Sequence, residues 1–187
     1  MRLKTDLVIM GSGMAGISAA DAALARGKKV MVFEKKPYQG GAVSNCPIAY
    51  LSIRNDKDFQ NTAFHLLYEY SNYNANPSVI RQYVNNSWRT KEYIERLGIK
   101  MIQTQKLELE DIGNPKYADG FPPAIMAHGD FYLVPGRGKG HGGALICLNA
   151  MKDIIKRGGQ YMLNTPITDI LVDENGKVNG VKAVNNE

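Results

Sequence analysis

The sequence predicts an α/β fold with a central parallel sheet, flanking helices and a C-terminal β-hairpin or meander, and three observations carry this prediction. Residues 6–33 alternate apolar strand, alanine-rich helix and apolar strand, residues 144–157 form another apolar helical stretch, and residues 168–184 hold two short strands around an Asn-Gly turn. The 187 residues are 44% apolar and 22% charged, as in an ordinary globular protein, so the length suggests one domain over residues 1–187.

Two strands and a helix open the chain. Residues 6–10 read Asp-Leu-Val-Ile-Met, an uninterrupted apolar run that is typical of a parallel strand buried on both faces. Residues 14–26 contain six alanines and predict a helix, which Gly27 ends as a C-terminal cap. Residues 29–33 predict a second apolar strand, which leads directly into Glu34.

A glycine-rich turn joins the first strand to the helix. Residues 11–16 read Gly-Ser-Gly-Met-Ala-Gly. Gly11 permits a tight turn, Gly13 lacks a β-carbon so that the backbone can approach a pyrophosphate, and Gly16 lets the helix pack closely on the sheet. The free N–H groups and the positive dipole end of the helix would face the phosphates.

An acidic residue completes this pattern. Glu34 lies 18 residues after Gly16, at the end of the second strand, where it can accept hydrogen bonds from the two ribose hydroxyls of an adenosine. Its charge would repel a 2′-phosphate, which argues against NADP. The alternative is a glycine-rich turn without a ligand, but strand, turn, helix and acid all stand in order, so the sequence predicts adenine-dinucleotide binding.

The stretch after Glu34 bears on which dinucleotide binds. An NAD-binding domain would place a helix soon after the second strand, whereas residues 35–45 read Lys-Lys-Pro-Tyr-Gln-Gly-Gly-Ala-Val-Ser-Asn. The backbone amides of this loop and the polar side chains of Ser44 and Asn45 would suit the ribityl and flavin end of a longer cofactor. The alternative is an ordinary surface loop.

These residues resemble the FAD-binding domain of the fumarate reductase and succinate dehydrogenase flavoprotein superfamily. The resemblance covers residues 6–16, the Glu-Lys-Lys-Pro and Gly-Gly steps of residues 34–41, the glycine-rich run 136–143, and residues 164–181. It implies a Rossmann-like fold that binds FAD. The cofactor-binding residues predicted from the motif and the resemblance are Gly11, Ser12, Gly13, Ala15, Gly16, Glu34, Lys35, Gly40, Gly41, Ala42, Val43, Ser44 and Ile167.

Two of these positions depend on comparison with the family. The resemblance implies that the backbone of Ile167 contacts the adenine. Soluble relatives usually place Asn after the Gly-Gly pair, where this chain has Ala42. Members with covalent FAD carry a histidine in the loop that follows, and none occurs between Glu34 and His65, so noncovalent FAD is expected.

The resemblance also implies an incomplete chain. The arginines and histidine that bind dicarboxylate and deliver the proton lie, in relatives, in a capping domain and a second FAD-binding segment, which would follow residue 187. We therefore name no catalytic residue, and expect the N-terminal part of a flavin-dependent oxidoreductase that acts on a small, carboxylate substrate and is served by an electron-donor protein. On its own this length should be inactive and hold flavin weakly or not at all. A non-catalytic dinucleotide-binding module and an NAD-dependent dehydrogenase half remain alternatives.

The middle of the chain gives fewer signals. Residues 58–73 and 78–97 predict two helices with core-facing apolar stripes, and residues 103–135, rich in Gly and Pro, predict an irregular connection or short strands. His128 with Asp130 is a candidate acid–base pair, and two exposed loop side chains are the alternative.

The segment from residue 136 onward is easier to interpret. The run at 136–143 lacks the spacing of a phosphate-binding P-loop, but Arg137, Lys139 and His141 are available to an anionic group. Ala144 to Ile155 is apolar almost all round and predicts a buried helix. Strands at residues 160–163, 168–172 and 177–184 follow.

Charge and composition exclude several classes of protein. The net charge is +5, of which +4 lies in residues 1–50, with seven basic and three acidic groups, and this suits an anionic small ligand. Basic residues occur in pairs between apolar stretches rather than as a stripe with aromatics, so nucleic-acid binding is not expected. No apolar run approaches a bilayer's thickness, so we expect a cytoplasmic protein without a membrane span. Cys46 and Cys147 have neither metal nor disulfide spacing, so no metal site is expected.

Overall fold

The structure is a computed structural model that describes residues 2–45, 48–106, 129–134 and 142–186. These residues form two compact units, Met1–Pro47 with Gly136–Glu187, and Ile48–Pro135. The expectation of a single domain over residues 1–187 stays a prediction. The helices that the structure describes all fall short of the length and apolarity that a membrane-spanning helix requires.

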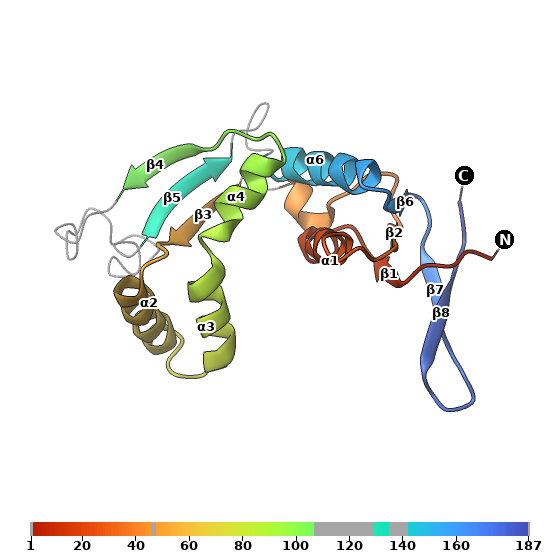
Figure 1. The fold of residues 1–187 in the computed structure, drawn as a ribbon, viewed down its shortest axis with the longest axis horizontal. Helices are drawn as coiled ribbons and strands as arrows, with labels where there is room; N and C mark the ends of the chain where they lie inside the picture. The colour runs from red at the N-terminus through yellow and green to blue at the C-terminus, as the bar shows by residue number, and fades with distance from the viewer. Residues whose placement is uncertain (1, 46–47, 107–128, 135–141, 187) are drawn as a thin grey trace. The chain divides into compact units, whose positions relative to one another are not determined.

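The first unit contains a parallel sheet, as predicted. Strands β1 (Leu7–Met10), β2 (Val30–Phe33) and β6 (Gln160–Met162) are ordered β1-β2-β6 and pair in parallel (Figure 1). All four residues of β2, the middle strand of this sheet, are buried, and α1 packs against the strand. In the described sheet β1 pairs only with β2, and its Leu7 and Met10 are 37% and 66% exposed. The prediction of burial on both faces, which was made for residues 6–10, is therefore wrong for β1, and the second apolar strand predicted at residues 29–33 is confirmed as β2.

Two helices accompany this sheet and contact one another. The predicted first helix is α1 (Met14–Leu24), which buries Ile17, Ala20 and Ala23. Helix α6 (Gly142–Lys156) begins two residues before its predicted start and ends one residue before the predicted end. The prediction that this helix is buried on almost all sides is wrong. Ile146, Cys147, Ala150 and Ile154 are buried, whereas Ile155 is 50% exposed, because only the face with helical spacing meets the rest of the unit.

An ion-pair network joins α1 to α6. The Arg157 guanidinium, just past the end of α6, donates through Nη2 to Oδ1 of Asp21 on α1 and lies 2.7 Å from Oδ2 of Asp153 on its own helix. The side chains of Arg157 and Asp21 are only 28% and 22% exposed, so water screens their attraction less than at an open surface.

The C-terminal hairpin forms as the sequence predicts. Strands β7 (Ile167–Val172) and β8 (Val178–Ala183) pair in antiparallel fashion. At the turn, Oδ1 of Asp173 accepts from the backbone N–H groups of Asn175 and Lys177, at 2.9 Å each, and Gly176 adopts a φ of +77°. An Asx turn followed by a residue with positive φ is the chemistry that the Asp-Glu-Asn-Gly sequence favours.

The second unit is built on an antiparallel sheet. Strands β3 (Ile48–Ile53), β4 (Ile102–Lys106) and β5 (Gly129–Val134) are ordered β3-β5-β4. The sequence analysis assigned no element to β3, while β4 and β5 confirm the short strands that were one option for residues 103–135. Of the proposed acid–base pair, His128 lies outside the described residues and Asp130 pairs with Ser52 of β3. Arg137, Lys139 and His141 also lie outside them.

The described part of this unit also contains three helices (Figure 1). They are α2 (Lys57–Tyr70), α3 (Pro77–Asn86) and α4 (Arg89–Arg96). The single helix predicted at residues 78–97 is thus divided, because the chain tightens at Ser87 into an i→i+3 turn, where the Thr90 N–H donates to the Ser87 carbonyl. The Ser87 hydroxyl accepts from the N–H of Ile53, at 2.9 Å. Among the described residues of the unit, Ile53, Ala63, Ile80 and Val84 form a buried hydrophobic cluster.

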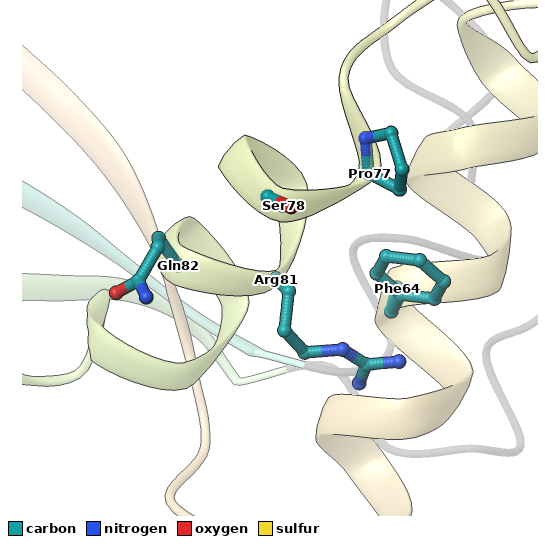
Figure 2. Close-up of a pocket in the computed structure, with 5 residues that line it drawn as sticks. All are labelled: Phe64, Pro77, Ser78, Arg81 and Gln82. Carbon is teal, nitrogen blue, oxygen red and sulfur yellow. The ribbon is translucent and has the colours of Figure 1, made fainter.

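Arg81 holds α2 and α3 together. Its guanidinium carbon lies 3.8 Å from the centre of the Phe64 ring, and its Nη1 donates to Oδ1 of Asn61 at 3.0 Å. Figure 2 shows the guanidinium of α3 directed toward Phe64 of α2, in a pocket also lined by Pro77, Ser78 and Gln82. The contact with the Phe64 ring and the hydrogen bond to Asn61 both join α3 to α2. The position of Arg81 is therefore explained by the packing of the two helices, and no ligand is needed to explain it.

The network around Arg157 predicts a difference between two charge neutralisations. Asp21→Asn should lower the free energy of unfolding by about 1–2 kcal/mol, because it removes a charge-assisted, half-buried hydrogen bond. Glu95→Gln is the control, since its partner Lys91 lies 3.3 Å away in an exposed i,i+4 pair worth about 0.3–0.5 kcal/mol. Urea denaturation of both variants measures the difference, and equal effects would contradict the anchoring role of Asp21.

Candidate functional site

The glycine turn lies at the carboxyl ends of β1 and β2. Gly11 has a φ of +92°, which favours glycine, and its N–H donates to the carbonyl of Phe33 at 2.7 Å. Gly13 is the N-cap residue of α1, with φ −67° and ψ 175°, and no side chain caps the helix there. Among the described residues, a β-carbon on Gly13 would meet no atom within 4 Å. The turn therefore has free space at Gly13, next to the start of α1, where no described side chain caps the helix.

Gly16 has the opposite surroundings. A β-carbon built on Gly16 would approach the Gly11 carbonyl oxygen more closely than real β-carbons approach any atom, and would lie 3.2 Å from Cγ2 of Ile9. The first turn of α1 is thus in direct contact with the strand and turn before it. This is the close helix–sheet packing that the third glycine of the motif predicts.

Glu34 ends β2 and is only 6% exposed. Its Oε2 accepts from the backbone N–H of Ser12 at 2.9 Å and from the Ser12 hydroxyl at 2.8 Å, and its Oε1 accepts from the N–H of Lys36 at 3.0 Å. Burial alone would raise the pKa of Glu34, but these hydrogen bonds and the nearby Lys35 ammonium outweigh it and hold the pKa below its ordinary value. The carboxylate therefore stays charged at neutral pH.

The chain after β6 runs beside Glu34. The Glu34 N–H donates to the carbonyl of Met162, and the N–H of Thr165 donates to the Glu34 carbonyl, at 2.8 Å each. Ile167, the predicted adenine contact, is the first residue of β7 and comes two residues after Thr165. The fold thus brings the segment of Ile167 back to the end of β2, and the contact with adenine stays a prediction.

The Gly-Gly step packs against the glycine turn. The Gly40 N–H donates to both the carbonyl and the hydroxyl oxygen of Ser12, at 3.1 Å each, and a β-carbon on Gly41 would lie 3.7 Å from Cα of Gly13. Gly40 has a φ of +103°, and a β-carbon there would meet Sγ of Cys147 on α6 at 2.8 Å. Only glycine satisfies both conditions at this position.

The residues after Gly40 form a short 3₁₀ helix, η1 (Gly41–Asn45), where the sequence predicted a loop. The Ser44 hydroxyl donates to the carbonyl of Gly41 at 2.7 Å, so its own polar group supports the turn. Ala42 is exposed and Val43 half-buried. Ala15 on α1 and Lys35 are also exposed, next to the contacts described above rather than within them.

Two residues of this region were missed by the sequence analysis. Cys147 of α6 is fully buried against Gly40, and burial raises the pKa of its thiol to about 11. Tyr161 of β6 has a buried hydroxyl near Ser12, Cys147 and Glu34, and burial raises its pKa to about 12. Both lie more than 100 residues from the glycine motif in the sequence, and no spacing or composition signal connects them to it.

Comparison with known proteins identifies relatives. The model of a family described as the FAD binding domain matches residues 6–187. An NADH:fumarate oxidoreductase of Klebsiella pneumoniae (strain 342) is 26% identical over 189 residues, which cover 97% of this chain and 18% of that protein. The chain therefore spans less than a fifth of the length of this curated relative.

Solved structures show the same fold. An open conformation of a flavocytochrome c3 fumarate reductase superposes with a TM-score of 0.71 and 18% identity, over 97% of this chain and 30% of that one. A quinol fumarate reductase subunit of E. coli superposes with a TM-score of 0.71 and 19% identity, over 98% of this chain and 29% of that one. A 3-ketosteroid dehydrogenase of Rhodococcus jostii RHA1 superposes with a TM-score of 0.70 and 17% identity, over 97% of this chain and 42% of that one.

These findings confirm the predicted α/β class and the resemblance to fumarate reductase flavoproteins. The family model extends over nearly the whole chain, from the first strand through the hairpin. Its described cofactor is FAD, which agrees with a turn open at Gly13 and a charged Glu34 at the end of the second strand. The chain belongs to the FAD-binding domain family.

Proposed function

We propose that this chain is the N-terminal FAD-binding portion of a flavin-dependent oxidoreductase, which in the whole protein transfers hydride at a carbon–carbon bond of a small carboxylate substrate. The observation that carries the proposal is the set of contacts among the glycine turn, Glu34 and the Gly40–Gly41 step in a chain of the FAD-binding family. The substrate class is supported by the relative named as an NADH:fumarate oxidoreductase. Bound FAD would supply the hydride chemistry, and this chain would bind and orient it.

The pyrophosphate of FAD would lie at Gly13. The absence of any atom within 4 Å of a β-carbon position there provides room for close approach, and the uncapped N–H groups of α1 provide donors. The helix dipole adds a favourable interaction with the negative charge. Ser12, by contrast, is fully buried and presents no surface to a ligand.

The ribose of the adenosine would meet Glu34. A carboxylate has about four acceptor positions, and three are used by the hydrogen bonds from Ser12 and Lys36. Oε2 accepts two of these hydrogen bonds and Oε1 accepts one, so the remaining acceptor position is on Oε1. Glu34 therefore has capacity for one ribose hydroxyl in this arrangement, and a 2′-phosphate next to the buried charge would be repelled.

The two glycines of the turn should respond differently to alanine. Gly13→Ala should leave the stability nearly unchanged, because its φ is allowed and its β-carbon meets nothing, but should weaken FAD binding at least about tenfold, or 1.4 kcal/mol. Gly16→Ala should destabilise the fold by roughly 3 kcal/mol, since the clash with Gly11 exceeds the gain of about 1 kcal/mol in helix propensity. Thermal unfolding and flavin fluorescence titration measure both, and a stable Gly16→Ala variant would contradict the packing argument.

The complete protein should be yellow when purified with FAD. An oxidised flavin should give absorption bands at about 370 and 450 nm. Acid denaturation should release the FAD, because residues 35–64 contain no histidine that could hold it covalently. Flavin that stays with the precipitated protein would contradict noncovalent binding. Tight NAD binding without flavin uptake would favour the dehydrogenase alternative, and FAD binding without substrate turnover would favour the non-catalytic module.

A further inference from the structure

The hydroxyl of Ser12 joins two parts of the site that lie on different segments. It donates to Oε2 of Glu34 at 2.8 Å and accepts from the N–H of Gly40 at 3.1 Å. The motif that predicts the turn leaves this position between the glycines unconstrained. The side chain is fully buried, so it can influence a ligand only through the groups that it touches.

We propose that Ser12 is a positioning residue whose hydroxyl locks the ribose-binding carboxylate of Glu34 to the Gly40–Gly41 step, so that FAD affinity depends on a side chain that no ligand reaches. This inference rests on the proposed function, because it assumes that Glu34 and the Gly-Gly step bind FAD. The chemistry requires a group that donates and accepts at once, which a hydroxyl does and a methyl group does not.

The remaining contacts show what the hydroxyl adds. Without it, Glu34 still accepts from the N–H groups of Ser12 and Lys36, and Gly40 still donates to the Ser12 carbonyl. Each segment would thus keep its own anchor, while the side-chain bridge between them would be lost. The Ser12→Ala protein should therefore fold, but its Glu34 side chain and Gly40 backbone should move independently of one another.

The groups that face Glu34 determine the sign of a pH effect. They are the Ser12 and Lys36 donors, the Lys35 ammonium, and Tyr161 from β6, which is neutral at physiological pH. Because the folded pKa of Glu34 is below its ordinary value of 4.5, the stability that the hydroxyl contributes through the carboxylate is present above about pH 4.5. It is lost as the pH falls through the folded pKa of Glu34, since the protonated carboxyl no longer attracts the donor as a charge.

The test compares Ser12→Ala with Ser18→Ala in the complete protein. Ser18 is an exposed residue of α1, the helix that follows the glycine turn, so the control makes the same chemical change nearby at a position exposed to solvent. Ser12→Ala should weaken FAD binding roughly tenfold through lost preorganisation. In the FAD-free protein it should speed hydrogen exchange at the amide of Gly40, and its loss of thermal stability should shrink below pH 4.5. Ser18→Ala should change none of these.

A double-mutant cycle with Glu34→Gln separates positioning from general destabilisation. If Ser12 acts through the carboxylate, Ser12→Ala should weaken FAD binding by less than about threefold in the Glu34→Gln background. An unchanged affinity and unchanged Gly40 exchange in Ser12→Ala would overturn the positioning role while the proposed function stands. A wild-type protein that binds no FAD would overturn both.

Discussion

The buried carboxylate of Glu34 is the constraint on which the organisation of the first unit depends. A charge that is 6% exposed must be satisfied by donors, and three hydrogen bonds from the glycine turn and the following residue satisfy it. These bonds tie the turn after β1 to the end of β2, and the backbone groups of Glu34 tie β2 to the segment after β6. Three stretches that are distant in the sequence therefore meet at one residue, whose ionised state is favoured by the same bonds.

Around this carboxylate, glycine residues determine the shape of the site. Gly16 allows α1 to touch the turn, and Gly40 allows the second loop to lie against Cys147 of α6. At both positions a β-carbon has no room, whereas at Gly13 it would have open space. The three glycines thus have two kinds of surroundings that look identical in the sequence: two permit contact within the protein, and one, at Gly13, has free space where we propose that the pyrophosphate binds. The ion pairs of Arg157 then hold α6 to α1, behind the turn.

The sequence predicts what depends on neighbouring residues and fails where distant pairing decides. The order from β1 through β2, the hairpin turn at Asp173 and the presence of helix α6 all follow from local spacing, and all were found. The exposure of Met10 and Ile155 was not predictable, because it depends on which partners a strand edge or helix face acquires. The site shows the same division. Glu34 was identified from its spacing, but its bonds to Ser12, and the approach of Cys147 to Gly40, arise only from the folded arrangement.

The geometry also limits what this chain decides about chemistry. Its described contacts lie around Gly13 and Glu34, the residues proposed to meet the pyrophosphate and the adenosine ribose of FAD. Proteins named as a fumarate reductase and a 3-ketosteroid dehydrogenase superpose on it equally well, with TM-scores of 0.71 and 0.70. A fold that fits both names cannot itself select between a dicarboxylate and a steroid. Substrate choice must therefore depend on groups outside the contacts described here, while the proposed roles of the glycine turn, Ser12 and Glu34 concern only the binding of the cofactor.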